Sequence, residues 1–244
     1  MNGGNLLRDA AIFVVASIAI AAAALGWHPD DWLIGEDRLL ETLSAILYAC
    51  ASLFAASLLI RLGRGAHPAL WFVAVFGMVC ALDEISFGAR LLDIEMPPME
   101  GGGEFDGAHD VIIVAVRALR AMPAPARWLA VGGTLVLCLV AAIMLRRLIL
   151  VAAEAVLADP VLLRIAICGT LLVFAQALDV DLFVIPRQMY FEEWAETSAG
   201  YWLLVSAFAA PRASRAWHRT IEWRLRSRPT QANSAIAPTA NRIA

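Results

Sequence analysis

Carboxylates at the ends of apolar segments are the residues in this sequence with the clearest capacity for chemistry. A carboxylate inside a membrane helix costs a few kcal/mol, so such residues usually face the interior of a helix bundle and find a partner there. If the segments bring their ends together, these acids form one site. The acids in question open or close four different apolar segments: Glu41, Asp83, Glu84, Asp179, Glu192, Glu193 and Glu196.

Oxygen ligands of this kind favour a hard cation such as Mg²⁺, Ca²⁺ or Mn²⁺. His109 falls on the same predicted side and extends the choice to Zn²⁺. We therefore expect these acids to be metal ligands, with a divalent cation as the cofactor. Two other interpretations remain open: the acids are solvated charges that follow membrane topology, or they line a proton or ion path. Asp83, Glu84 and Asp179 are the more informative acids, because the helix dipole disfavours a negative charge at a C-terminal end.

The densest polar motif is Asp-Glu-Ile-Ser-Phe-Gly-Ala-Arg at positions 83–90. Glu84, Ser86, Arg90 and His109 are the predicted catalytic residues, with His109 as the base that a Ser86 nucleophile needs. Arg90, Arg117 and Arg120 are predicted to hold an anionic head group, because guanidinium groups bind phosphate and carboxylate well. Metalloprotease, esterase and P-loop motifs are missing from the sequence.

This motif resembles that of an uncharacterised family of polytopic bacterial inner-membrane proteins with a Glu-Glu-x-Ser-Trp-Gly-Gln-Arg stretch, a nearby proline and a downstream His-Asn. Asp83, Phe87, Ala89 and Asp110 depart from that pattern. The matching positions here are Glu84, Ser86, Gly88, Arg90, Pro97 and His109. The resemblance implies a membrane location and a polar network that the Gln and Asn departures weaken; it implies no particular activity.

The elements that must position these residues are membrane helices. The chain has 244 residues, of which 61% are apolar, too many for a soluble domain to cover. We predict an all-α polytopic bundle over residues 1–210, since backbone groups in lipid must pair within their own segment. Six apolar windows, each near the length that crosses a bilayer, fall at residues 10–27, 39–60, 66–82, 128–145, 161–178 and 194–210. The first window also has the composition of a cleavable signal peptide.

Arginines set the predicted orientation. Six alternating helices place 13 arginines and four acids on one side, and six arginines and 18 acids on the other. Positively charged loops stay in the cytoplasm. We therefore expect a bacterial inner-membrane protein with both termini inside and the acidic helix ends on the exoplasmic face.

Three segments lie outside the six windows. Residues 111–122 are too short to span and are predicted to lie along the interface or to re-enter it. Residues 211–228 combine six arginines with two tryptophans, which predicts a basic amphipathic juxtamembrane helix on anionic lipid rather than a nucleic-acid site. Residues 229–244 are predicted to be a disordered tail. The four cysteines, each inside an apolar run, are expected to be buried thiols.

Three functions fit these features. The first is a divalent-metal-dependent membrane enzyme that acts on a lipid or lipid-linked substrate at the exoplasmic face. The second is a proton- or cation-coupled transporter, which the inner halves of the helices disfavour because they carry few ionisable groups. The third is a non-catalytic membrane component that holds partners through its helices. The sequence leaves the oligomeric state open.

Overall fold

The computed structural model describes residues 3–26, 39–92, 94–99, 102, 105, 107, 110–180, 182 and 188–226. Within these ranges the chain is helical and has no β-strand, as predicted. Each of the six apolar windows overlaps one long helix: α1 (Gly3–Gly26), α2 (Leu39–Leu62), α3 (Ala69–Glu84), α6 (Ala124–Met144), α8 (Pro160–Asp179) and α9 (Gln188–Arg226).

The core is built by α2, α3, α8 and α9, with α9 packed against both α8 and α2, and α2 packed against α3. Glycine permits the closest contacts. A Cβ atom on Gly77 of α3 would lie 3.0 Å from the Tyr48 carbonyl oxygen of α2, and one on Gly200 of α9 would lie 3.0 Å from the Leu47 Cβ. Small residues at helix crossings let membrane helices approach closely enough for van der Waals packing.

Helix α1 packs against α9 through aromatic side chains. The Phe13 ring lies 5.9 Å from the ring of Trp194 and 5.7 Å from that of Trp202. The Trp194 indole also donates a hydrogen bond to the Ser17 hydroxyl, at 3.2 Å. The half-buried indole nitrogen is thereby satisfied, which lets a large ring fill the α1–α9 contact.

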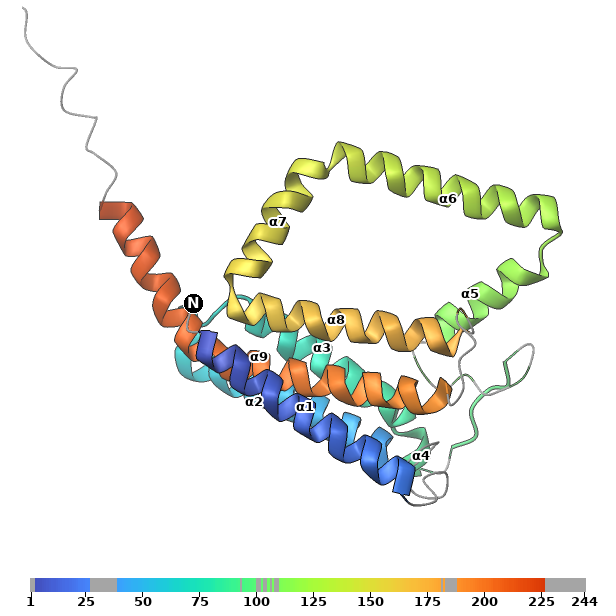
Figure 1. The fold of residues 1–244 in the computed structure, drawn as a ribbon, viewed down its shortest axis with the longest axis horizontal. Helices are drawn as coiled ribbons and strands as arrows, with labels where there is room; N and C mark the ends of the chain where they lie inside the picture. The colour runs from blue at the N-terminus through green and yellow to red at the C-terminus, as the bar shows by residue number, and fades with distance from the viewer. Residues whose placement is uncertain are drawn as a thin grey trace, which may run out of the picture.

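Helices α6 and α7 (Arg146–Ala158) stand apart from this core. With α5 (Asp110–Ala121) and α8 they outline a four-sided arrangement, which we call the frame (Figure 1). No residue of α6 or α7 is buried. Short helical turns complete the described chain: Gly63–Gly65, Ser86–Gly88 and α4 (Ala89–Leu92).

Three of the described helical segments are long and apolar enough to cross a membrane: Leu39–Gly65, Ala124–Met144 and Pro160–Asp179. Helix α3, at 16 residues, is about 24 Å long and shorter than a usual span. The predicted interfacial run at 111–122 is the helix α5. The predicted juxtamembrane segment is no separate helix up to Arg226, because α9 continues through Pro211 to that residue.

The prediction that all four cysteines are buried is wrong for two of them. Cys168 is buried and Cys80 is half-buried, but Cys50 and Cys138 are exposed on the outside of α2 and α6. A small apolar thiol on a membrane helix is as compatible with lipid as with the core. An apolar neighbourhood in the sequence therefore does not distinguish a cysteine on the outside of a helix from one buried in the core.

Candidate functional site

Four helix ends meet at one end of the core. The Thr197 hydroxyl of α9 donates to the Leu40 carbonyl of α2, at 3.1 Å. The Tyr48 hydroxyl of α2 donates to the Glu196 carbonyl of α9, also at 3.1 Å. These two bonds fix the N-terminal end of α9 beside the N-terminal end of α2, where Glu41 lies in the first turn.

Glu196 is the centre of this acidic end. Its side chain is partly buried and lies within electrostatic reach of Glu84, Asp179, Glu192 and Glu193. These acids come from the C-terminal ends of α3 and α8 and from the first turns of α9. Like charges at short range repel one another, so the free energy of the cluster depends on the protons or groups of opposite charge that it binds.

The C-terminal end of α8 is held in place by side chains from other segments. Gln188 of α9 donates to the Leu178 carbonyl, and Arg120 of α5 donates to the Val180 carbonyl at 2.7 Å. Gln176 donates to the Asp179 carboxylate at 2.8 Å. These bonds satisfy carbonyls that have no partner within the helix and fix the position of Asp179.

The motif at 83–90 contains a turn with an unusual backbone. Ser86 and Phe87 adopt φ values of 49° and 52°, in the left-handed region, and Gly88 follows at 89°. A left-handed conformation costs a non-glycine residue about 1–2 kcal/mol. Ser86 is buried in this turn, whereas the Phe87 side chain is exposed. Strained backbone that persists next to a cluster of acids supports a functional role for the motif.

Two of the three predicted head-group arginines lie on α5 and donate to backbone carbonyls. Arg117 donates to Gly102 at 2.7 Å, and Arg120 donates to Val180. Arg90 belongs to the short helix α4 directly after the strained turn. His109 lies outside the described residues, so the predicted pair of Ser86 and His109 stays a prediction.

The binding of a metal by these acids stays a prediction. Within the described ranges, no three side chains of His, Cys, Asp or Glu stand in a geometry that could hold a metal ion. The acids converge on one end of the bundle without meeting at one point.

The opposite end of the bundle holds a buried ion pair that the sequence analysis missed. Arg164 of α8, only 2% exposed, donates to the Asp9 carboxylate of α1 at 2.6 Å and 3.1 Å. It also donates to the Pro160 carbonyl, and the Tyr201 hydroxyl donates to the Asp9 carbonyl at 2.9 Å. Both charges are therefore satisfied, and the pair joins α1, α8 and α9. The available signal was Arg164 inside an otherwise apolar window, together with Asp9 just before the first window.

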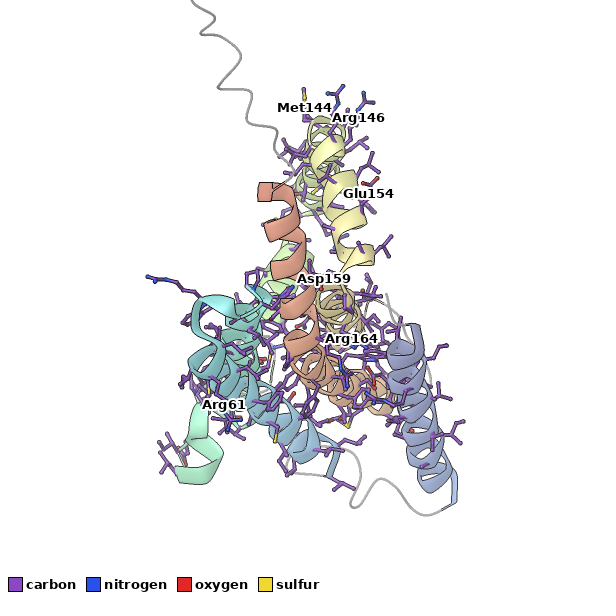
Figure 2. The ribbon with its side chains drawn as sticks, turned by 90° about the vertical axis from the view of Figure 1, so that its left-hand side faces the viewer. Arg61, Met144, Arg146, Glu154, Asp159 and Arg164 are labelled. Carbon is purple, nitrogen blue, oxygen red and sulfur yellow. The ribbon has the colours of Figure 1, made fainter. Side chains whose placement is uncertain are left out.

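His67 and Asp159 form a second pair at that end, 2.8 Å apart. Figure 2 shows that Asp159 and Arg164 lie at the same end as Arg61. Burial would raise the pKa of the Asp159 carboxyl, but the bonds from His67 and from the Val161 and Leu162 amides prevail and lower it. A shallow, mainly apolar depression of about 380 Å³ adjoins the pair. The His67–Asp159 pair joins the segment just before α3 to the N-terminus of α8.

No family model, no curated protein and no solved structure matches this chain. The assignment of a function therefore rests on the geometry and charge of the acidic end.

Proposed function

We propose that this chain is a six-span inner-membrane protein that binds a divalent cation at its acidic end and acts there on a lipid or lipid-linked substrate. The observation that carries the proposal is the convergence of Glu84, Asp179, Glu192 and Glu193 on Glu196. Oxygen ligands from three helices are the donor set that Mg²⁺, Ca²⁺ or Mn²⁺ prefers. Asp83 and Glu41 lie at the same end and can complete the ligand set.

A six-span topology is supported by the direction of the helices. α1, α3 and α8 lead away from the end where the N-terminus is marked, and α2, α6 and α9 lead back to it (Figure 1). The spans are then these six helices, with the last span in the first part of α9. Arginine-rich loops place both termini in the cytoplasm and the acidic end on the exoplasmic side. The basic residues after Pro211 then lie against anionic lipid.

An enzyme fits better than a transporter because the middle of the core is apolar. Buried residues there include Ala51, Val73 and Leu203. The hydroxyls of Ser52 and Ser206 donate to nearby backbone carbonyls. The four core helices α2, α3, α8 and α9 carry no charged residue between the acidic end and the position of Arg164 along the bundle. The carboxylates of the acidic end would hold the cation near the membrane surface, where it would supply Lewis-acid chemistry to a substrate there.

Metal content and thermal stability test this proposal. The purified full-length protein is expected to contain about one divalent cation per chain and to melt at a lower temperature after treatment with EDTA. Adding back Mn²⁺ or Mg²⁺ should restore the original melting temperature. A protein without divalent cations whose melting temperature is the same with and without EDTA contradicts the proposal. Cation-dependent flux in proteoliposomes favours the transporter instead.

A further inference from the structure

The depression beside the His67–Asp159 pair lies at the end of the core opposite to the acidic end. Its walls are the first two turns of α3, the first two turns of α8 and the residues just before each helix. Its volume of about 380 Å³ lies near the lower end of the range in which proteins hold small ligands. The depression is therefore large enough to receive part of another molecule.

The polar side chains of the depression are bonded to the protein itself. The Ala69 amide donates to His67 Nδ1, so Nε2 carries the ring proton and donates to the Asp159 carboxylate at 2.8 Å. The other oxygen of that carboxylate accepts from the Val161 and Leu162 amides. The rest of the lining is apolar, so the part of a ligand that fits the depression is hydrocarbon.

The depth of the depression indicates which hydrocarbon is present there. The segment Pro160–Asp179 is long and apolar enough to cross a membrane. Leu162 and Ile165 lie about 3 Å and about 8 Å along it from its first residue, where head groups give way to acyl chains. On the α3 side, Phe72 is 47% exposed and stacks on Phe76, with the ring centroids 4.9 Å apart. The acyl chain of a lipid is therefore the occupant that fits.

Two arginines beside the depression carry free positive charge. Arg61 lies in the last turn of α2, and Arg64 lies in the turn Gly63–Gly65 that leads to His67. Both are exposed, and neither forms a hydrogen bond or an ion pair with another described residue. Arg64 precedes His67 by three residues, so their Cα atoms are at most about 11 Å apart. A head group above the depression is within reach of this charge.

Charge, rather than apolar contact, selects the lipid. Hydrocarbon gains little when it moves from the bilayer to an apolar helix surface, because the two are similarly apolar. An arginine near the membrane surface, in contrast, favours an anionic head group by about fivefold. A second copy of the chain at this place would bring a second set of arginines and add like charge.

We propose that the depression holds one acyl chain of a phospholipid whose anionic head group is bound by Arg61 and Arg64. The site lies at the opposite end of the core from the acidic end and needs no cation there. In the proposed topology it draws on the cytoplasmic leaflet, which is the leaflet that carries anionic lipid.

A photo-crosslinker in the depression tests the inference. In the full-length protein p-benzoylphenylalanine replaces Phe72, and the nanodiscs contain equal amounts of phosphatidylglycerol and phosphatidylcholine with the same acyl chains. Mass spectrometry after irradiation identifies the captured lipid, which should be mainly phosphatidylglycerol. R61Q/R64Q should reduce the preference about 25-fold, because each arginine contributes about fivefold. R61K/R64K should keep most of it.

Two matched controls locate the site. The same replacement at Phe174, which is exposed near the other end of α8, should capture the two lipids in proportion to their content. R146Q/R147Q removes two exposed arginines at the start of α7 and should leave capture at position 72 unchanged. Equal capture of both lipids at position 72 overturns the inference, and so does a preference that persists in R61Q/R64Q. Crosslinking of position 72 to a second chain also overturns it, because a copy of the protein then fills the depression.

Cation binding separates this inference from the proposed function. Glu196→Gln is expected to weaken cation binding and to leave lipid capture at position 72 unchanged. A protein that captures phosphatidylglycerol selectively but binds no divalent cation contradicts the proposed function alone. One that binds the cation and captures both lipids equally contradicts the lipid site alone.

Discussion

Charged residues inside the helices lie in two kinds of environment, one with a partner of opposite charge and one among charges of the same sign. Arg164 and Asp9 are buried together and bonded to each other, and backbone and hydroxyl groups complete their hydrogen bonds. Glu196 instead lies among acids of the same sign. A satisfied pair is typical of a structural contact, whereas a cluster of one sign is typical of a binding site. We therefore assign the first to stability and propose the second as the binding site.

Breaking the ion pair should be costly, and removing both partners should cost much less. Asp9→Leu or Arg164→Met leaves one buried charge without its partner and should destabilise the protein by about 3 kcal/mol. The double variant removes both charges, so its loss should be well below the sum of the single losses. Thermal unfolding in detergent measures all three. Additive losses contradict a direct interaction. Arg8→Gln, which removes an exposed arginine that also contacts Asp9, is the control and should cost less than about 1 kcal/mol.

Phe87 offers a test of the strained turn. At its φ of 52°, glycine is favoured over any residue with a Cβ atom. Phe87→Gly should therefore be more stable than Phe87→Ala by about 1 kcal/mol, since both lose the ring and only glycine relieves the backbone. The comparison is made by thermal unfolding. If the alanine variant is as stable as the glycine variant, the turn carries no strain.

Both ends of helix α8 are held by polar contacts with other segments. At one end of α8, Asp159 accepts hydrogen bonds from the Val161 and Leu162 amides and contacts His67. At the other end, Gln188 and Arg120 bond its last carbonyls. Each end is thus tied to a different neighbouring segment. The core position of α8 follows from these end contacts as well as from packing.

Asp159 should make the stability of the protein depend on pH. Its pKa in the folded state lies below its ordinary value of 3.8. The charge therefore stabilises the folded state above that value, and the effect is lost as the pH falls through the folded pKa. Asp159→Asn keeps a good helix cap and removes the charge. Its melting temperature should lie below that of the wild type at pH 6, and the difference should shrink below pH 3.8. A difference that stays constant with pH contradicts the role of the charge.

The sequence predicted the positions of the helices better than it predicted which side chains of different helices lie close together. The length and apolar composition of a segment are local properties of the sequence. The positions of α2 and α8 therefore follow from the sequence alone. The proximity of Glu84 to Glu196 and the contact of Asp9 with Arg164 depend on which helices are neighbours. Charge sign alone does not determine that choice. The frame was also not predicted, because exposed and buried apolar helices in a membrane have similar compositions.

At the scale of the whole molecule, charge and direction divide the chain into two faces. Arg61 lies at the opposite end of α2 from Glu41, and Arg164 lies near the opposite end of α8 from Asp179. The proposed topology follows from this division together with the positive-inside preference of arginine-rich loops.

Reporter fusions test the topology. Alkaline phosphatase, which is active only outside the cytoplasm, should be active when fused after Gly102 and inactive when fused after Gly65 or after Ala244. Green fluorescent protein fusions at the same positions are the complementary control and should give the reverse pattern. Phosphatase activity at the C-terminus means an odd number of spans or the opposite orientation.

Binding of Mn²⁺ to the purified protein, measured from the loss of the free-ion signal in electron paramagnetic resonance, tests the acidic end most directly. The wild type is expected to bind one Mn²⁺ per chain in a saturable manner. Glu84→Gln and Glu196→Gln should each weaken binding about tenfold or more. Glu154→Gln, which removes an exposed acid of α7, should bind like the wild type. Binding that does not saturate, or that falls equally in all three variants, would contradict a cation site at the acidic end.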